Sequence, residues 1–390
     1  MNESPIMDAS LFQKSDSGTL VPTIEGMQAF APNKLPPDIN LGNIISEFGE
    51  ASAALGGLRE IGSTINNPYM VIRPLQRNEA LRSSAMEGTF STADDLALVE
   101  ALDEASSNDS AREVHNYIRA IDFAIEQVQH LPISHRVIRG MHAVLLERST
   151  KVRGSNKRPG EYKIHQNWIG ALQIQNARFI PPPPREAMGS MDDLERYINA
   201  EHAPIPPLIV AGLCHYQFET IHPFSDGNGR VGRMLITLQL LSEGLLNSPL
   251  LYVSPFIEGN KDEYIDSMFA VSARGDWERW LRFFLKAIKE SCIETTKTIG
   301  LLNDLQDKYR GLLQEKSKSV SALQISDRLF EQPVISITDA SKICGTSYQS
   351  AKKNVEQLVK LGILQQVRGY ENPKLFWAKE IIDISDGRVA

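Results

Sequence analysis

The sequence predicts a mainly α-helical protein that also contains a short β-hairpin and a C-terminal winged helix-turn-helix. Apolar residues recur at helical spacing along most of the 390-residue chain, as they do in amphipathic helices. A stretch rich in proline and glycine interrupts this pattern in the middle of the chain, and such a stretch favours turns and short strands. Near the C-terminus, two short helical patterns are followed by two strand-like runs. Since a domain averages about 150 residues, the length favours two or three domains.

The composition restricts the class of protein. The content of 42% hydrophobic and 23% charged residues is ordinary for a soluble globular chain, and a net charge of −7 gives no overall signature of nucleic-acid binding. No run approaches the ~18 apolar residues that a membrane span needs, and the N-terminus lacks a basic and apolar leader. The three cysteines are far apart and have no metal-ligand spacing. These features predict a cytoplasmic protein that does not enter a membrane.

The first part of the chain is expected to form an extended arm followed by two helices. Residues 1–40 are polar and interrupted by prolines, which favours an arm on the surface. Apolar residues at helical spacing predict a helix over 41–62. A second helix is expected from Pro74 to Gly88, because glycine is common just after a helix C-terminus. Glu87 is unusual there, since a carboxylate in the last turn costs about 0.5 kcal/mol unless a cation faces it.

The next part of the chain combines helices with one hairpin. Amphipathic helices are predicted over 111–130 and 134–147. The stretch 151–184, which ends in four prolines, predicts irregular structure. Within it we expect a short hairpin, in which Trp168-Ile169 pairs with Arg178-Phe179-Ile180.

A glycine-rich loop separates two buried helices in the centre of the chain. The run 206–218 begins with two prolines and is then mostly apolar, and a second apolar run follows Arg230. Gly227-Asn228-Gly229 is therefore expected at a helix N-terminus, where unpaired N–H groups and the helix dipole attract an anion such as phosphate. Arg230 and Arg233 lie on one side of the first helical turn, and both can hold phosphate oxygens.

Two other side chains of this loop have the chemistry for phosphate transfer. Asp226 is a hard oxygen ligand for Mg²⁺, an ion that usually takes one or two carboxylates together with phosphate oxygens and water. His222 precedes a proline, which favours a position outside the helix. An ordinary histidine pKa near neutrality suits the removal of a proton from an incoming hydroxyl. The loop therefore predicts a nucleotide phosphate site with a histidine base.

The loop from His222 to Arg233 resembles the signature of the Fic (filamentation induced by cAMP) family at every defined position, His-Pro-Phe-x-Asp-Gly-Asn-Gly-Arg-x-x-Arg. The resemblance implies a Fic-fold helical bundle and a protein adenylyltransferase, which moves AMP from ATP to a hydroxyl of a target protein. It implies that His222 is the catalytic base and Asp226 the Mg²⁺ ligand. The residues that it implies at the nucleotide are Asp226, Gly227, Asn228, Gly229, Arg230, Val231, Gly232 and Arg233. The alternative is a glycine-rich turn with surface arginines.

Ser83-x-x-x-Glu87-Gly88 resembles the inhibitory motif of the same family, Ser/Thr-x-x-x-Glu-Gly/Asn. The resemblance implies that Glu87 pairs with Arg233 at the nucleotide site, so that ATP binds without a productive orientation of its γ-phosphate. The protein would then be autoinhibited by its own N-terminal region. Two alternatives stay open: a plain helix C-terminus, and a reaction known in some relatives in which this glutamate positions a water for AMP removal.

The resemblance extends to the hairpin and to Tyr264. The hairpin resembles the flap of the family, which implies that Trp168, Ile169, Gly170 and Ala171 hold the target segment in strand-like register. An ordinary surface hairpin is the alternative. Tyr264 aligns with a position whose aromatic side chain lines the nucleotide pocket of the family, which implies contact with adenine or ribose. A tyrosine that only packs is an equally open interpretation.

The C-terminal region has the pattern of a winged helix-turn-helix. A long polar helix is expected from 290 to 313, and beyond it two helices joined by a glycine-containing turn precede a two-stranded wing. The recognition helix would begin at Ser347. From Lys316 onward, eleven Lys or Arg residues against eight Asp or Glu residues give a net charge of +3, which is only mildly basic. DNA contact, dimerisation and target docking therefore all stay open for this unit.

Together these features predict a Mg²⁺-dependent protein adenylyltransferase that modifies Ser, Thr or Tyr hydroxyls of target proteins and of itself, and that Glu87 restrains. Its expected partners are ATP and a target protein on the flap, with a homodimer and DNA as open options. A nucleotide-sensing, DNA-binding transcription regulator is the alternative of another class. The predicted divisions are an N-terminal arm and helical region with the inhibitory helix (1–105), a Fic catalytic core (106–290), a linker helix (291–318) and the winged helix-turn-helix domain (319–390).

Overall fold

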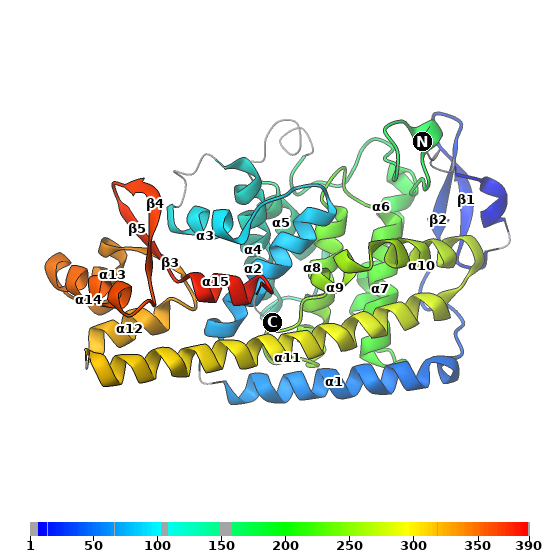
Figure 1. The fold of residues 1–390 in the computed structure, drawn as a ribbon. Coiled ribbons are helices and arrows are strands. Elements are labelled where there is room, and N and C mark those ends of the chain that lie inside the picture. Colours follow the sequence, from blue (N-terminus) through cyan, green and yellow to red (C-terminus); the bar gives the residue numbers. More distant parts are fainter. Residues whose placement is uncertain are drawn as a thin grey trace.

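The computed structural model describes residues 7–13, 15–65, 67–102, 108–147, 158–317 and 319–388. These residues form an elongated and mostly helical molecule (Figure 1), which confirms the predicted fold class. Two long helices, α1 (Ile45–Thr64) and α11 (Trp277–Lys316), run side by side along one edge of the molecule (Figure 1). The N-terminal hairpin and the C-terminal unit lie at opposite ends of it (Figure 1).

The N-terminal residues form a β-hairpin, and the prediction of an extended arm is wrong for them. Strand β1 (Gly18–Pro22) pairs antiparallel with β2 (Gln28–Pro32), and Gly26 supports the turn with a φ of 77°. Phe30 on β2 is fully buried, with its ring 5.5 Å from the ring of Phe12. The hairpin is stabilised because Phe30 buries apolar surface together with Phe12, which precedes the strands, and burial of apolar surface is the main favourable term in folding.

The predicted helices of the central region are all present, and the structure adds α3, α6, α9 and α10, which we did not predict. Helix α2 also begins earlier than expected, so that Pro74 lies inside it. The elements before α11 are η1 (Ala9–Phe12), η2 (Leu41–Ile44), α2 (Tyr69–Met86), α3 (Ala93–Leu102), α4 (Asp109–Val128), α5 (His135–Leu145), η5 (Ile174–Asn176), α6 (Pro184–Ile198), α7 (Pro207–Ile221), α8 (Asn228–Ser242), α9 (Ser254–Gly259) and α10 (Lys261–Arg274).

Helix α11 is a single helix of 40 residues. Its N-terminal half carries buried aromatic residues, among them Trp280 and Phe284. Its C-terminal half contains the stretch that we predicted as a separate linker helix, and it buries Leu302 and Leu305. The boundary predicted at residue 290 therefore lies within one continuous helix.

Within residues 319–388, the C-terminal unit has four helices and a three-stranded antiparallel sheet with the strand order β3-β5-β4. The predicted pair of helices joined by a glycine turn is present as α13 and α14, with Gly345 at a φ of 59° between them. The two strands that were predicted there pair antiparallel as β4 and β5. The elements are α12 (Val320–Arg328), β3 (Val334–Ser336), α13 (Ile337–Cys344), α14 (Tyr348–Lys360), β4 (Gln365–Glu371), β5 (Lys374–Trp377) and α15 (Lys379–Ser385).

Helix α15 returns from the C-terminal unit and packs against α2 and α3. Arg82 on α2 donates to the Asp386 carboxylate at 3.3 Å, and Lys379 donates to the Asp94 carboxylate at 2.7 Å. Arg77 on α2 is buried and donates to the backbone oxygen of Glu331. The C-terminal unit is thus bound to the helix that carries the predicted inhibitory motif.

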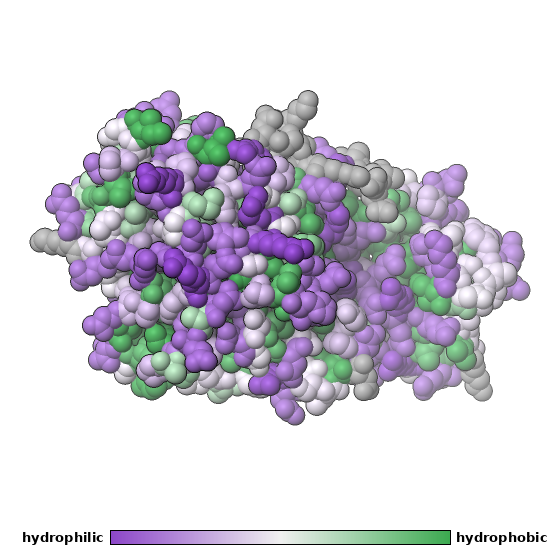
Figure 2. Space-filling view, turned by 180° about the vertical axis from the view of Figure 1, so that it is seen from behind, coloured by the Kyte–Doolittle hydropathy of each residue, from purple (hydrophilic) through white to green (hydrophobic). Residues whose placement is uncertain are grey.

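Figure 2 shows hydrophilic side chains over most of one face, with small hydrophobic patches between them. Within the described residues, no helix combines the length and the apolar character that crossing a membrane requires.

Candidate active site

The glycine-rich loop joins the ends of two buried helices, as the sequence predicts. Helix α7 ends at Ile221, and His222 follows in the left-handed region with a φ of 48°. Gly227 has a φ of 78° and immediately precedes α8. A left-handed conformation is rare for residues other than glycine, so contacts from the surrounding structure must hold His222 in place.

The His222 ring is oriented for use as a base. Its Nδ1 atom lies 3.2 Å from the backbone oxygen of Glu219, so the Nδ1–H donates to this carbonyl and Nε2 keeps its lone pair. Burial and the nearby Lys163 ammonium lower the pKa of His222 to about 4. At neutral pH the imidazole is therefore uncharged and able to accept a proton.

Asn228 stabilises the loop through its side chain. Its Oδ1 accepts from the Phe224 N–H at 2.8 Å, and its Nδ2 donates to the Phe224 oxygen at the same distance. Because the side chain is only 2% exposed and already bonded within the loop, the backbone N–H is what Asn228 has left for a phosphate. The predicted role of Asn228 at the nucleotide thus stays a prediction for its backbone alone.

Replacement of Asn228 with Ala is expected to lower the free energy of unfolding by about 1–3 kcal/mol, because the buried Phe224 N–H loses its acceptor. Urea denaturation at 25 °C measures the change. The matched control is Asn247→Ala at an exposed position, which should stay within about 0.5 kcal/mol of the natural protein. Equal destabilisation by the two substitutions would contradict this role of Asn228.

The first turn of α8 presents positive groups that suit an anion. Arg230 is 4% exposed, and its Nη2 lies 3.5 Å from the Asp226 carboxylate. In the described part of the chain its buried Nε has no hydrogen-bond acceptor. A buried N–H donor without an acceptor is costly, so a phosphate oxygen fits this position. Asp226 is 31% exposed, which leaves a carboxylate open to a metal ion.

No group of three or more His, Cys, Asp or Glu side chains that could hold a metal ion occurs among the described residues. A Mg²⁺ that takes one carboxylate together with phosphate oxygens and water does not need such a group. The residues present therefore fit Mg²⁺ that is bound through Asp226 together with a nucleotide.

Arg233 is held by the segment that resembles the inhibitory motif. Its Nε donates to the Ser83 hydroxyl at 2.8 Å, and its Nη2 donates to the Glu87 carboxylate at 2.8 Å and to the Ser83 backbone oxygen at 2.9 Å. Arg233 is 2% exposed, whereas the Glu87 side chain is 36% exposed. Burial opposes ionisation of Glu87, but the Arg233 guanidinium outweighs it and lowers the pKa of Glu87. The cation that the dipole argument required for Glu87 is therefore Arg233.

Gly229 and Gly88 allow this approach of Glu87 to the loop. A Cβ atom on Gly229 would lie 2.2 Å from a carboxylate oxygen of Glu87, closer than any real contact. Gly88 has a φ of 79°, a conformation that glycine adopts without strain, and it ends α2 directly after Glu87. The two glycines thus bring the end of α2 to the start of α8.

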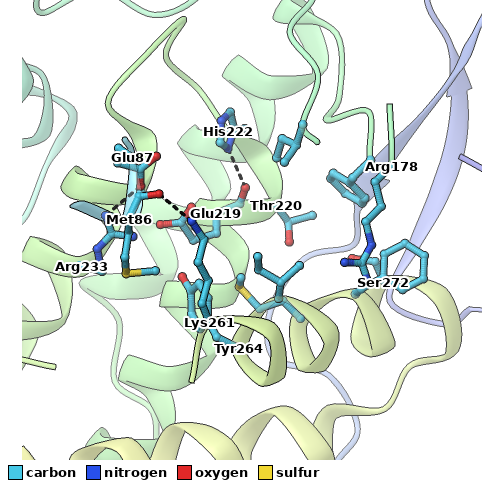
Figure 3. A pocket seen from close by; sticks show the side chains of 16 residues that line it. Met86, Glu87, Arg178, Glu219, Thr220, His222, Arg233, Lys261, Tyr264 and Ser272 are labelled. Atoms are coloured by element: carbon cyan, nitrogen blue, oxygen red, sulfur yellow. Dashed lines mark hydrogen bonds and ion pairs between the residues drawn. The ribbon is translucent and has the colours of Figure 1, made fainter. Parts of the chain in front are cut away.

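A pocket of about 280 Å³ opens beside these residues (Figure 3). Of the predicted set it brings together Glu87, Ile169, His222, Gly229, Arg233 and Tyr264. Asp226 and Arg230 do not line it, and Val231 and Gly232 face the packed interior, where Gly232 lies against the Glu219 carboxylate. Some of the predicted site residues therefore line the pocket, whereas others, such as Asp226 and Arg230, lie beside it around the start of α8.

Tyr264 forms part of the pocket wall and is also fixed from behind. It is 4% exposed, and its hydroxyl lies 2.8 Å from Nε2 of the buried His215. The other ring nitrogen of His215 lies 3.0 Å from the Gly232 oxygen. Tyr264 is therefore both a packed residue and part of the pocket lining.

The predicted hairpin is reduced to one antiparallel bridge between Ile169 and Phe179. Ile169 donates to the Phe179 oxygen at 2.9 Å and accepts from Arg178 at 3.0 Å. Trp168 is 37% exposed and donates to the Ala171 oxygen, while Gly170 has a φ of 89°. The four predicted flap residues therefore lie together at the rim of the pocket that Ile169 lines.

Several residues near the loop were not predicted as site residues. Lys261 lines the pocket and donates to the Met86 oxygen at 2.8 Å. His142 lies 3.0 Å from the Asp226 oxygen and stacks on Phe224. Lys163 and Asn167 contact the loop from behind. None belongs to a local pattern, so only the folded chain reveals them.

Comparisons with known proteins point to one family. The model of the Fic/DOC family N-terminal region matches residues 45–126, and the Fic/DOC family model matches residues 132–240. The "Protein adenylyltransferase Fic" of Drosophila sechellia is 28% identical over 213 residues, which are 53% of this chain and 38% of that protein. Its namesake in Drosophila persimilis is 26% identical over 244 residues, 60% of this chain and 43% of that protein. The chain thus corresponds to less than half of either relative.

The fold has a match among solved structures. The crystal structure of a Fic family protein from Desulfovibrio desulfuricans G20 superposes with a TM-score of 0.55 and 18% identity. The match covers 88% of this chain and 98% of that one. It supports the fold over most of the chain, including residues beyond those that the family models match.

Proposed function

Because the chain belongs to the Fic/DOC family, we propose that it is a protein adenylyltransferase, which transfers AMP from ATP to a hydroxyl of a target protein. The observation that carries the proposal is the position of a neutral imidazole and two buried guanidinium groups around the N-terminus of α8. Phosphoryl transfer requires a general base and an anion-binding site from the protein, because catalysis of this reaction is mostly positioning and charge stabilisation.

In the proposed reaction, His222 Nε2 removes the proton from a Ser, Thr or Tyr hydroxyl of the target. The hydroxyl oxygen forms a bond to the α-phosphorus of ATP, and the bond from this phosphorus to the bridging oxygen breaks, so that pyrophosphate leaves with the electron pair. Arg230 and the N–H groups at the start of α8 stabilise the charge that develops on the phosphate oxygens. Mg²⁺ held by Asp226 supplies further positive charge when it is bound.

We propose that Glu87 restrains this reaction by occupying Arg233. The pair at 2.8 Å supports this role, because a guanidinium bound to Glu87 and Ser83 is not free to orient the γ-phosphate. The opposite direction, removal of AMP by a water that Glu87 positions, is supported by the same location of Glu87 in the pocket lining. The two directions make different demands on Glu87, because a restraint is not needed for AMP transfer whereas a group that positions water is needed for AMP removal.

The target protein is proposed to dock on the flap. Exposed backbone beside the single bridge between Ile169 and Phe179 is suited to pairing with an extended segment. Trp168 and Leu172 also expose apolar surface there, at 37% and 98%. Backbone pairing depends little on the target's side chains, so targets of varied sequence fit this mode.

For the C-terminal unit we propose a winged helix-turn-helix, on the order of its helices and strands. Helix α14, the second of the pair joined by the glycine turn, exposes Lys352 and Lys353, which keeps DNA contact open as a second function. Sequence-selective retention of a promoter fragment, lost in Lys352→Ala/Lys353→Ala and at high salt, would favour this regulator over target docking.

Intact-mass spectrometry after incubation with ATP and Mg²⁺ tests the proposed function. We expect an added mass of one AMP on the protein itself, because a target on the flap is brought close to His222 and exposed hydroxyls of a second copy can take that place. Incubation with the non-hydrolysable α,β-methylene analogue of ATP is the control and should add nothing. Absence of AMP from both the protein and a panel of candidate targets, in the natural and Glu87→Gly forms, would contradict the proposal.

A further inference from the structure

The backbone of the catalytic loop is held from behind by one short segment, residues 163–167. The Lys163 ammonium donates to the Ile221 oxygen at 3.3 Å, and the Lys163 backbone N–H donates to the Pro223 oxygen at 2.8 Å. The Asn167 amide donates to the His222 oxygen at 3.0 Å and to the Phe224 oxygen at 2.9 Å. Four consecutive carbonyl oxygens on either side of the His222 ring are thus bound by two residues.

Lys163 is buried in a way that requires an explanation. It is 4% exposed, and the described part of the chain provides no carboxylate within ion-pair distance of its ammonium. Its other hydrogen bond runs to the Asn167 side-chain oxygen at 2.7 Å. Burial lowers the pKa of Lys163 to about 7. An unpaired buried cation is costly, so a position of this kind points to a functional requirement.

We propose that Lys163 and Asn167 are positioning residues for His222, which hold residues 221–224 so that the imidazole faces the pocket as a neutral base. The proposal rests on the proposed function of the loop, but it concerns residues that no motif assigns. It explains how His222 keeps a φ of 48°, a conformation that its own chain does not favour. The bond from Lys163 to Asn167 also fixes the amide whose two hydrogens hold the loop.

The charge of Lys163 supplies the second part of the role. Burial first and the Lys163 ammonium next lower the pKa of His222, while the Glu87 carboxylate acts in the opposite direction. Burial raises the pKa of Glu219 to about 7. The other ionisable groups that line the pocket with His222, Glu87 and Glu219 are Arg178, Arg233, Lys261 and Tyr264. A cation behind the ring thus opposes the protonation that Glu87 favours from the pocket.

Asn167 also joins the catalytic loop to the flap. Trp168 follows it directly, and Ile169 makes the bridge to Phe179. A target strand that pairs with the flap would therefore lie next to the segment that holds His222. The residues that hold the loop and the first residues of the flap thus lie within the eight residues from Lys163 to Gly170.

Two measurements test the proposal. In the first, the NMR titration of the His222 ring is followed in protein labelled at histidine, with assignment by His222→Ala. Lys163→Met is expected to raise the pKa of His222 by about one unit, because an opposing cation is lost, whereas Lys163→Arg should leave it near the natural value. The control is Ile164→Ala, which changes an exposed side chain of the same segment.

In the second measurement, steady-state AMP transfer separates positioning from nucleotide binding. Asn167→Ala is expected to lower kcat roughly 10- to 100-fold with the KM for ATP unchanged, because the phosphate-binding groups of α8 are untouched. The acid limb of the pH–rate profile should move to higher pH in Lys163→Met and stay in place in Asn167→Ala, which keeps the cation.

The outcomes separate this proposal from the proposed function. The NMR titration needs no turnover, so it decides the electrostatic role of Lys163 even if the natural protein transfers no AMP, a result that would contradict only the function. An unchanged His222 titration in Lys163→Met, or an unchanged kcat in Asn167→Ala, would overturn the proposal. If Lys163→Met does not fold, two other variants still decide the proposal. Asn167→Ala must lower kcat, and Lys163→Arg must leave the pKa of His222 unchanged.

Discussion

Replacement of His222 with Ala is expected to lower AMP transfer by about 10²–10⁴-fold, the usual contribution of a positioned general base. His222 is the imidazole in the pocket lining, and its Nε2 is free because Nδ1–H donates to the Glu219 oxygen. The guanidinium groups and N–H groups at α8 remain, so the Kd for ATP should change little. Labelled AMP on the protein measures the first expectation, and calorimetric titration with ATP the second.

His165→Ala is the matched control, because His165 is an exposed histidine close in the sequence to the flap. It should keep the transfer rate of the natural protein. If His222→Ala and His165→Ala label equally well, His222 is not the base, and the proposed chemistry of the loop must be given up.

Replacement of Glu87 with Gly is expected to raise AMP transfer by roughly tenfold, since one charge-assisted hydrogen bond to a partly exposed carboxylate is worth about 1–2 kcal/mol after solvent screening. The substitution releases Arg233, which Ser83 alone then holds, and makes it available to the γ-phosphate. Incorporation of AMP from labelled ATP by the two forms gives the ratio.

Glu87→Gln is the control that separates charge from space, because it keeps the size of the side chain and removes its charge. It should activate less than Glu87→Gly. A Glu87→Gly form that transfers AMP at the natural rate would show that the pair with Arg233 is structural. A modified target, incubated with both forms, then tests the reverse direction: loss of AMP that requires Glu87 identifies removal as the reaction, whereas a Glu87→Gly form that only adds AMP identifies Glu87 as a restraint.

The helix–loop–helix at the centre could be predicted because its signals are local. Proline at the start of α7, glycine at 227 and an apolar run in α8 each act within a few residues. The pair of Glu87 and Arg233 had a weaker basis, since dipole reasoning requires a cation near Glu87 but does not say which one. The family resemblance named it, and the distance of 2.8 Å agrees.

Other features were beyond sequence reasoning for physical reasons. The contact of Lys163 with the Ile221 oxygen joins positions 58 residues apart, and a backbone carbonyl carries no sequence signal. The β1–β2 hairpin was missed because proline ends both strands, and its stability comes from Phe12, which lies outside them. Helix α3 was missed because its buried apolar residues include neighbours in the sequence, Leu96 and Ala97, which blurs the period of a one-sided helix.

The continuous helix α11 has a consequence for anyone who wishes to dissect the molecule. A fragment that stops at residue 290 would lack the last hundred residues, which include the surface that packs against α2. The Glu331 oxygen that accepts a hydrogen bond from Arg77 belongs to this surface. Helix α2, whose C-cap is Glu87, would then lose its contacts with the C-terminal unit. An excised catalytic fragment should therefore differ from the intact chain in its resting rate, and the two are not interchangeable reagents.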